Sequence, residues 1–347
     1  YVQLALTEDP GNDDARAWSE ALDAISNRAA FLLDVGRAHC RKGRFEKGLS
    51  LFLQSLALER SPAAHALAGR ALLALQRLSE AEEHLSAALD LRPDDVEALR
   101  DLVSAQALAG KNAEAGQTVE RLLAIEPENV EGLTARARLQ LRAGDAGPAT
   151  ATIGKIVALA PDRPATWFLE AWRLKAAGRG KRARLAVERA VSLDTQYPPP
   201  WLEAAALLAE LGDAAVADLC RSKFLHLIDE KDATRGAEPS AALRDIEVES
   251  RELDELELQP EELARALENR AVFYAALGEL ARSRRFYDRL AIELPQYETS
   301  DTACRRSLLL LQLNDVPSAR TALQRALLLD PGSTAARAMQ DRIAGMQ

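Results

Sequence analysis

Apolar and polar residues follow each other along the chain in one recurring order: an Ala- and Leu-rich segment, a proline, a few polar residues, then a second apolar segment. Four copies of this order are "ALDLRPDDVEALR" (88–100), "LLAIEPENVEGLT" (122–134), "IVALAPDRPATWF" (156–168) and "ALLLDPGSTAARA" (326–338). Proline cannot continue a helix, and Asp or Asn after it can cap the next one. Each copy therefore predicts the end of one helix and the start of another.

The spacing of these breaks is regular. Pro93, Pro127 and Pro161 are 34 residues apart, and so are Gly110, Gly144, Gly178 and Gly212. Each glycine lies near the middle between two breaks, where a short turn would separate two helices. The repeating unit is therefore a helix A, a glycine turn, a helix B and a proline break. A single unit cannot bury its apolar face alone, so we expect the units to stack.

The residues at fixed places in this unit resemble the tetratricopeptide repeat (TPR) family. Residues 62–95 carry small, bulky and proline residues where that family has them: Gly69, Ala81, Leu85, Ala88 and Pro93. Similar units are 29–61, 96–129, 130–163, 164–197, 198–231, 264–297 and 300–333. The resemblance implies an all-α, right-handed α-solenoid of antiparallel helix pairs with about eight units. We expect irregular, truncated helices over 1–28, six units over 29–231, two over 264–333, and a cap helix over 334–347.

Composition agrees with a helical protein and limits its class. The chain is 48% hydrophobic and only 5% aromatic, with no apolar run long enough for a membrane span. Its three cysteines are far apart and form no motif, which favours buried thiols over a disulfide framework. The first residues contain no signal peptide and no initiator Met, so we expect a processed or truncated chain. Compartment stays open: cytoplasm is favoured, and periplasm requires a removed signal. The Ala, Leu and Arg bias indicates a bacterial origin.

Charge is concentrated in two blocks. Residues 232–263 contain 11 acidic and 3 basic residues, whereas the rest of the chain has 42 acidic and 41 basic ones. This stretch lacks the TPR pattern, and we expect a degenerate repeat or an insertion there. Residues 163–189 contain 8 basic and 2 acidic residues. Opposite blocks can pair, so one hypothesis is that 240–258 occupies a basic surface of its own or a second molecule, which includes self-association. The alternative is a solvated acidic face.

In the TPR family the helix A faces line a concave groove. The resemblance places nine residues at the groove-facing positions: Arg37, Arg41, Arg70, Arg100, Arg138, Arg142, Phe168, Trp172 and Lys175. Guanidinium groups bind carboxylates through paired hydrogen bonds, so this set predicts recognition of an acidic peptide segment. The alternative is that an Arg-rich chain places Arg at any set of surface positions. The Lys and Asn pair used by chaperone-tail binders is absent, so that subtype is not expected.

Motifs for catalysis or metal binding are missing from the sequence. The four histidines are scattered, and CxxC, HExxH and GxSxG motifs do not occur. The "GRGK" at 178–181 has Lys175 and Arg182 where a P-loop needs Gly and Ser or Thr, so it predicts a turn. We expect no enzyme activity, cofactor, metal or small-molecule substrate. The sequence predicts a protein-binding scaffold or adaptor. The alternatives are a non-catalytic module of a larger enzyme or exopolysaccharide secretion protein, and weak nucleic-acid contact through 163–189.

Overall fold

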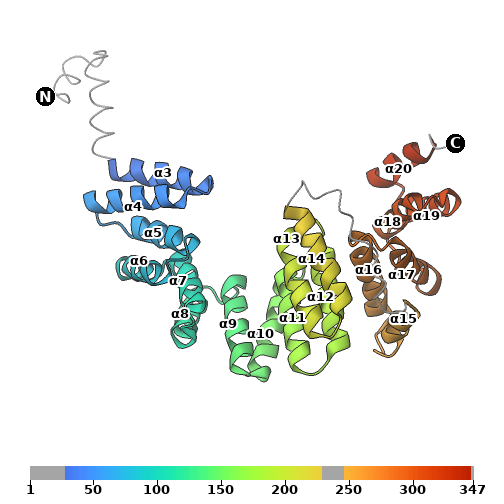
Figure 1. Cartoon of the computed structure of the whole chain (residues 1–347), viewed down its shortest axis with the longest axis horizontal. Helices are drawn as coiled ribbons and strands as arrows, with labels where there is room; N and C mark the ends of the chain where they lie inside the picture. Colours follow the sequence, from blue (N-terminus) through green and yellow to red (C-terminus); the bar gives the residue numbers. More distant parts are fainter. Residues whose placement is uncertain (1–27, 229–245, 345–347) are drawn as a thin grey trace, which may run out of the picture. The chain divides into compact units, whose positions relative to one another are not determined.

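The computed structural model describes residues 28–228 and 246–344, and over these ranges it contains 18 helices and no strand (Figure 1). The all-α fold class that the sequence predicts is therefore confirmed. The irregular helices expected over 1–28 lie outside the described residues, apart from residue 28. The chain forms two compact units, which are described separately: unit 1 ends at Arg142 and unit 2 begins at Ala143. This boundary falls inside the expected repeat 130–163.

Unit 1 consists of helix pairs whose bounds follow the 34-residue repeat. Its helices are α3 (Arg28–Arg41), α4 (Phe45–Leu58), α5 (Pro62–Ala74), α6 (Leu78–Leu91), α7 (Val96–Leu108), α8 (Asn112–Ile125) and α9 (Val130–Ala143), the last ending one residue into unit 2. Helices α3 and α4, α5 and α6, and α7 and α8 pack as consecutive pairs. Helices α3, α5 and α7 are the helix A members, and α5 packs against both of its neighbours in this series.

Unit 2 continues the same helix-turn-helix pattern with one interruption. Its helices are α10 (Ala146–Leu159), α11 (Pro164–Ala176), α12 (Gly180–Leu193), α13 (Pro198–Glu210), α14 (Ala214–Ile228), α15 (Ile246–Asp254), α16 (Pro260–Ala276), α17 (Leu280–Glu293), α18 (Ser300–Gln312), α19 (Val316–Leu329) and α20 (Thr334–Ala344). The packed pairs are α11 and α12, α13 and α14, α16 and α17, and α18 and α19. Helix α15 belongs to no such pair and comes from the acidic stretch.

The glycines spaced by 34 residues occupy the turns between helix A and helix B. Gly110 has a φ of 75° and Gly178 a φ of 72°, in the left-handed region that glycine adopts without strain. Two non-glycine residues, Gln76 and Asn314, adopt the same region at equivalent turns. The "GRGK" sequence is thus a helix-to-helix turn, as the sequence predicts. At the proline break between α6 and α7, Asp95 caps α7 by accepting a hydrogen bond from the amide of Ala98 at 3.0 Å.

Small residues let the paired helices approach closely. A Cβ atom built on Gly69 in α5 would lie 2.5 Å from Cγ of Leu85 in α6, closer than carbon atoms can pack. Ala81, Leu85 and Ala88 are completely buried in the same interface. The small and bulky positions that carry the family resemblance are therefore the residues that join the two helices of a pair.

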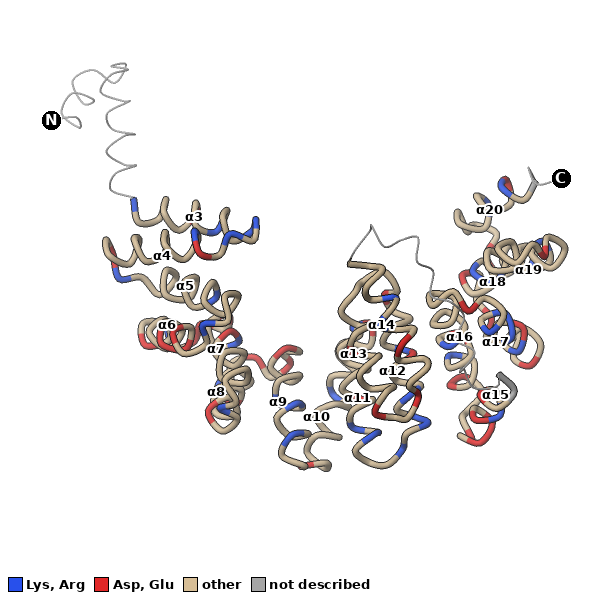
Figure 2. Tube along the Cα trace, viewed as in Figure 1, with Lys and Arg blue, Asp and Glu red and all other residues tan. Residues whose placement is uncertain are grey.

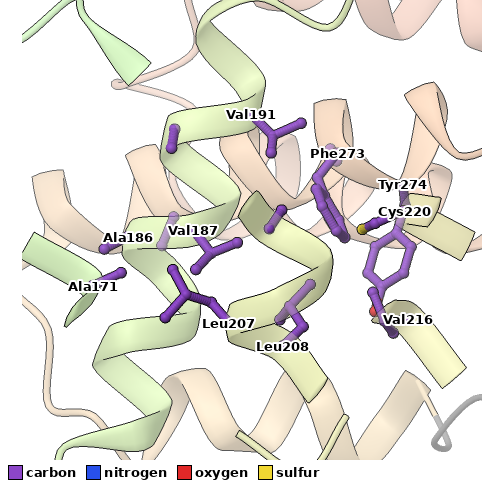
Figure 3. Packing of buried hydrophobic residues seen from close by; sticks show 14 of the residues in the cluster. Ala171, Ala186, Val187, Val191, Leu207, Leu208, Val216, Cys220, Phe273 and Tyr274 are labelled. Carbon is purple, nitrogen blue, oxygen red and sulfur yellow. The ribbon is translucent and has the colours of Figure 1, made fainter. Parts of the chain in front are cut away.

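In unit 2 one contact does not follow the order of the chain. Helix α16 packs directly against α12, although α13, α14 and α15 lie between them in the sequence. Aromatic rings fill this junction: the ring centroids of Trp201 and Phe273 are 5.8 Å apart, and those of Tyr274 and Phe286 are 5.9 Å apart. Figure 3 shows Phe273 and Tyr274 in the same apolar cluster as residues of α12, α13 and α14. The acidic stretch, where the repeat pattern fails, thus precedes a local change in helix packing.

The last helix closes the apolar surface of the final pair. Ile343 of α20 is buried, and Met339 packs against the cluster formed by α18 and α19. The three cysteines are free: Cys220 and Cys304 are buried and Cys40 is half-buried. No helix within residues 28–228 and 246–344 is both long and apolar enough to cross a membrane.

Candidate peptide-binding site

Three of the arginines predicted to bind a partner meet at one pocket of unit 1. The pocket has a volume of about 380 Å³ and lies between α3, α4 and α5. Its lining residues are Arg37, Cys40, Arg41, Phe45, Phe52, Leu67, Arg70 and Ala71. Arginines from α3 and α5 therefore border a floor made of aromatic and aliphatic side chains. Such a pocket suits a ligand that combines an apolar group with a carboxylate.

Arg70 is held in place by two carboxylates of the next helix A. Its Nε lies 2.7 Å from Asp101, and one terminal nitrogen lies 2.7 Å from Glu97. The hydrogen bond and charge of Arg70 lower the pKa of Glu97. Burial raises the pKa of Asp101, although the same arginine favours its ionised form. The charge of Arg70 is thus already shared with α7, and its guanidinium group is fixed in orientation.

The other arginines of α3 and α7 form part of the same mixed-charge surface. Arg37 binds Asp34 one turn away on α3 at 3.0 Å. The positive charge of Arg100 acts on both Glu97 and Asp101. The helix A face formed by α3, α5 and α7 therefore carries both positive and negative side chains. A purely basic groove would require Arg70 to be unpaired, but it is paired with Glu97 and Asp101.

Three exposed arginines of the predicted set form no ion pair within the ranges that the structure describes. These are Arg41 at the rim of the pocket and Arg138 and Arg142 on α9, all of them exposed. Among the described residues, their guanidinium groups have no carboxylate to displace before they bind one from a partner.

The three predicted site residues of unit 2 differ in burial and in their contacts. Phe168 is only 2% exposed and packs in the core, so the prediction that its ring contacts a partner is wrong. Trp172 is half-buried, and the Lys175 ammonium lies 4.9 Å from the centroid of its ring. Lys175 also forms an ion pair with Glu210. The position of Phe168 in the repeat does not predict its burial, because the neighbouring helices determine how much of its ring is covered.

The cations of the basic block 163–189 are largely paired within unit 2. Arg173 binds Glu170 at 2.5 Å, and Arg189 donates a hydrogen bond to Asn269 at 3.0 Å. Lys181 pairs with Glu255, which follows α15. This pairing leaves little free charge for phosphates and counts against nucleic-acid contact through the block.

Sequence reasoning missed a buried cluster of charged groups in unit 2. It consists of Arg184, Glu188, Asp213, Glu249, Arg270, Tyr274 and Arg282, contributed by α12, α15, α16, α17 and the turn before α14. The opposed charge blocks were the only sequence signal for it. They indicate that two segments can pair, but they do not say which side chains are buried. Within the described residues, no group of three or more His, Cys, Asp or Glu side chains is arranged to hold a metal ion.

Comparison with known proteins agrees with this architecture of packed helix-turn-helix units. Residues 72–139 match the family model described as "Tetratricopeptide repeat". The resemblance to the TPR family that the sequence predicts is thereby confirmed, and these residues are identified as tetratricopeptide repeats. No curated protein matches the sequence.

Several solved TPR structures are similar to this chain. A thermophilic TPR protein of Thermus thermophilus is 19% identical over 52% of this chain and 99% of its own, with a TM-score of 0.45. A TPR protein of Parabacteroides merdae is 14% identical over 91% of this chain and 98% of its own, with a TM-score of 0.43. YrrB, described as a TPR protein with an unusual peptide-binding site, is 13% identical over 51% of this chain and 92% of its own, with a TM-score of 0.43.

Proposed function

We propose that the protein is an interaction scaffold or adaptor that binds an acidic peptide segment of a partner protein on the helix A face of unit 1. TPR proteins bind peptides and proteins through the extended surfaces that stacked repeats create. The observation that carries the acidic specificity is the pocket between α3, α4 and α5, where Arg37, Arg41 and Arg70 border an apolar floor.

The charges at this pocket suggest how a peptide would bind. Arg41 has no carboxylate partner within the described residues, so it can accept a peptide carboxylate without breaking an ion pair. Arg70 is already oriented by Glu97 and Asp101, so it loses less side-chain entropy when it donates a further hydrogen bond to a peptide oxygen. An apolar peptide side chain would cover Phe45 and Leu67 and displace water from the pocket floor. Arg138 and Arg142 would extend the contact along the peptide.

A binding measurement with short synthetic peptides tests this proposal. Fluorescence anisotropy would compare acidic peptides that contain one Leu or Phe with basic peptides of equal length. We expect binding of the acidic peptides only, and Arg41→Ala should weaken it about tenfold through loss of one charge-assisted pair. Arg44→Ala is the matched control, because Arg44 is exposed but does not line the pocket. Equal losses for both variants, or equal binding of basic peptides, would contradict the proposal.

The alternative of a module within a larger enzyme or secretion protein shares this binding role, and the full-length reading frame distinguishes the two. A catalytic or β-barrel domain encoded beside the repeats would favour the module. Self-association through 240–258 also stays a prediction. It is tested by measuring the mass of the protein in solution over a range of concentrations, with a constant monomer mass as the outcome against it.

A further inference from the structure

The acidic helix α15, whose Asp and Glu residues are red in Figure 2, forms ion pairs with α12 and α17 of its own unit and a hydrogen bond with α16. Cations from two helices reach it: Arg184 from α12, and Arg282 and Arg289 from α17. Lys181 of α12 pairs with Glu255, the residue directly after α15. Helix α16 adds Arg270, which donates a hydrogen bond to the backbone carbonyl of Glu249 at 3.0 Å. The packing of α5 against α6, by contrast, uses small and apolar residues.

Glu249 is the centre of this contact. It is completely buried, and its carboxylate lies 3.0 Å from Arg184 and 3.3 Å from Arg282. The hydroxyl of Tyr274 donates to the same carboxylate at 2.7 Å and accepts a hydrogen bond from Arg184 at 2.8 Å. Burial raises the pKa of Tyr274, so this hydroxyl keeps its proton and remains a donor. Three side chains thus converge on one carboxylate.

Glu249 supplies an acceptor that several buried donors of the cluster share. Arg184 also pairs with Glu188 and Asp213, and Arg282 also pairs with Glu279 at 3.9 Å. One terminal nitrogen of Arg184 and the hydroxyl of Tyr274, however, both donate to the carboxylate of Glu249. A buried donor without an acceptor is unfavourable, so these helices favour a carboxylate at the place of Glu249.

The rest of α15 extends the contact by one apolar anchor and further polar groups. Leu253 lies one turn after Glu249 and is 1% exposed. Arg289 donates to the carbonyl and the hydroxyl of Ser250, at 2.8 and 2.9 Å, and pairs with Asp254. The recognised pattern is therefore a helical Glu, a Leu four residues later, and an Asp directly after it.

Helix α15 is not joined to both of its neighbours by short turns. The helices of a repeat pair are joined by turns of two to three residues, whereas residues 229–245 separate the end of α14 from the start of α15. Residues 255–259 join α15 to α16, and side-chain contacts with α12, α16 and α17 add to this connection. We propose that these three helices form a binding site specific for an acidic helix, and that α15 occupies it as an intramolecular ligand. This site lies in unit 2 and does not depend on the peptide pocket of unit 1.

A peptide added to the full-length protein tests the site. The probe is a fluorescent peptide of residues 246–258, and the receptor is the full chain carrying Glu249→Gln and Leu253→Ala, which weakens its own α15. We expect the peptide to bind this variant at least about 100-fold more tightly than wild type, whose site is already filled. A peptide with Glu249→Gln should not bind. A peptide with Glu257→Gln should bind like the unmodified one, since Glu257 is exposed and has no ion pair within the described residues.

Equal affinity for the wild-type and variant chains, or equal binding of the Glu249→Gln peptide, would overturn the proposal. If circular dichroism shows that the variant does not fold, hydrogen exchange of the wild-type chain decides. A helix bound as a ligand should undock by itself, so the amides of α15 should exchange faster than those of α12 and α16. Exchange of all three helices at one common rate would show that α15 is an inseparable part of the core.

Discussion

His65 of α5 and His84 of α6 face each other, with 3.2 Å between their Nδ1 atoms. Only one of these two nitrogens can carry a proton in a hydrogen bond, so the pair is compatible with neutral rings. Burial lowers the pKa of both histidines. The charges of His84 and Arg60 lower the pKa of His65 further, whereas Glu83 and Glu80 partly restore that of His84. The contact thus joins the two helices of a repeat in a pH-dependent way.

This geometry predicts that acid destabilises unit 1. A histidine whose pKa is lower in the folded state contributes its stability above its unfolded pKa, about 6.5. That contribution is lost as the pH falls below this value towards the folded pKa. We expect urea midpoints for unit 1 to decrease from pH 7.5 to pH 5.5, and His84→Gln to reduce this dependence. His226→Gln, an exposed substitution in unit 2, is the control and should leave the pH dependence unchanged.

Two glycines in helix interiors should respond oppositely to alanine. In Gly69→Ala the new Cβ would lie 2.5 Å from Leu85, so α5 and α6 must move apart, at a cost of about 1–3 kcal/mol of unfolding free energy. In Gly116→Ala no atom of the described residues outside its own helix turn lies within 4 Å of the new Cβ. Alanine lowers the conformational entropy of the unfolded chain, so this substitution should stabilise α8 by about 0.5–1 kcal/mol. Chemical denaturation of both variants measures the difference. Two changes of the same sign would contradict the packing described for the α5 and α6 pair.

Two arginines of α16 distinguish a buried from a surface ion pair. Arg270 is 2% exposed and holds the buried carboxylate of Glu188 at 2.9 Å, so Arg270→Ala takes from this carboxylate one of its two arginines, the other being Arg184. We expect a loss of about 3–5 kcal/mol of unfolding free energy in unit 2. Arg265 pairs with Glu261 on the exposed face of the same helix, and Arg265→Ala should change stability by less than about 0.5 kcal/mol. Thermal or urea unfolding would measure both, and similar losses would show that the cluster is solvated.

The local features of the sequence were sufficient to predict the repeating fold. Pro and Gly act through the backbone of their own segment, so the helix ends and turns follow from residues such as Gly110 and Asp95. The small residues of 62–95 identified the close helix pair for the same reason. Such signals repeat every 34 residues and need no knowledge of distant parts of the chain.

The candidate site depended on contacts that span many residues, and so it was predicted only in part. Arg37, Arg41 and Arg70 do meet at one pocket, because the repeat places equivalent positions on one face. The pairing of Arg70 with Asp101 and the burial of Phe168 result from neighbouring helices and could not be inferred from position alone. The packing of α16 against α12 was also unpredicted, since the repeat pattern stops before it.

The three cysteines should differ in reactivity, and one of them reports on the peptide pocket. Cys220 and Cys304 are buried, and burial raises the pKa of both thiols, so thiol reagents should reach them only after unfolding. Cys40 lines the pocket and is half-buried. Burial raises its pKa as well, so it should react more slowly than a free thiol but faster than the other two. Mass spectrometry after timed alkylation measures the three rates.

An acidic peptide bound in the pocket should cover Cys40 and slow its alkylation, because Arg41 and Cys40 border the same cavity. Arg41→Ala should shift this protection to about tenfold higher peptide concentrations, without changing the reaction rate in the absence of peptide. The rate of Cys220 is the internal control, since a change there would report unfolding of unit 2. If the peptide binds and Cys40 remains equally reactive, the peptide lies elsewhere on the protein, and the exposed guanidinium groups of Arg138 and Arg142 become the next place to test.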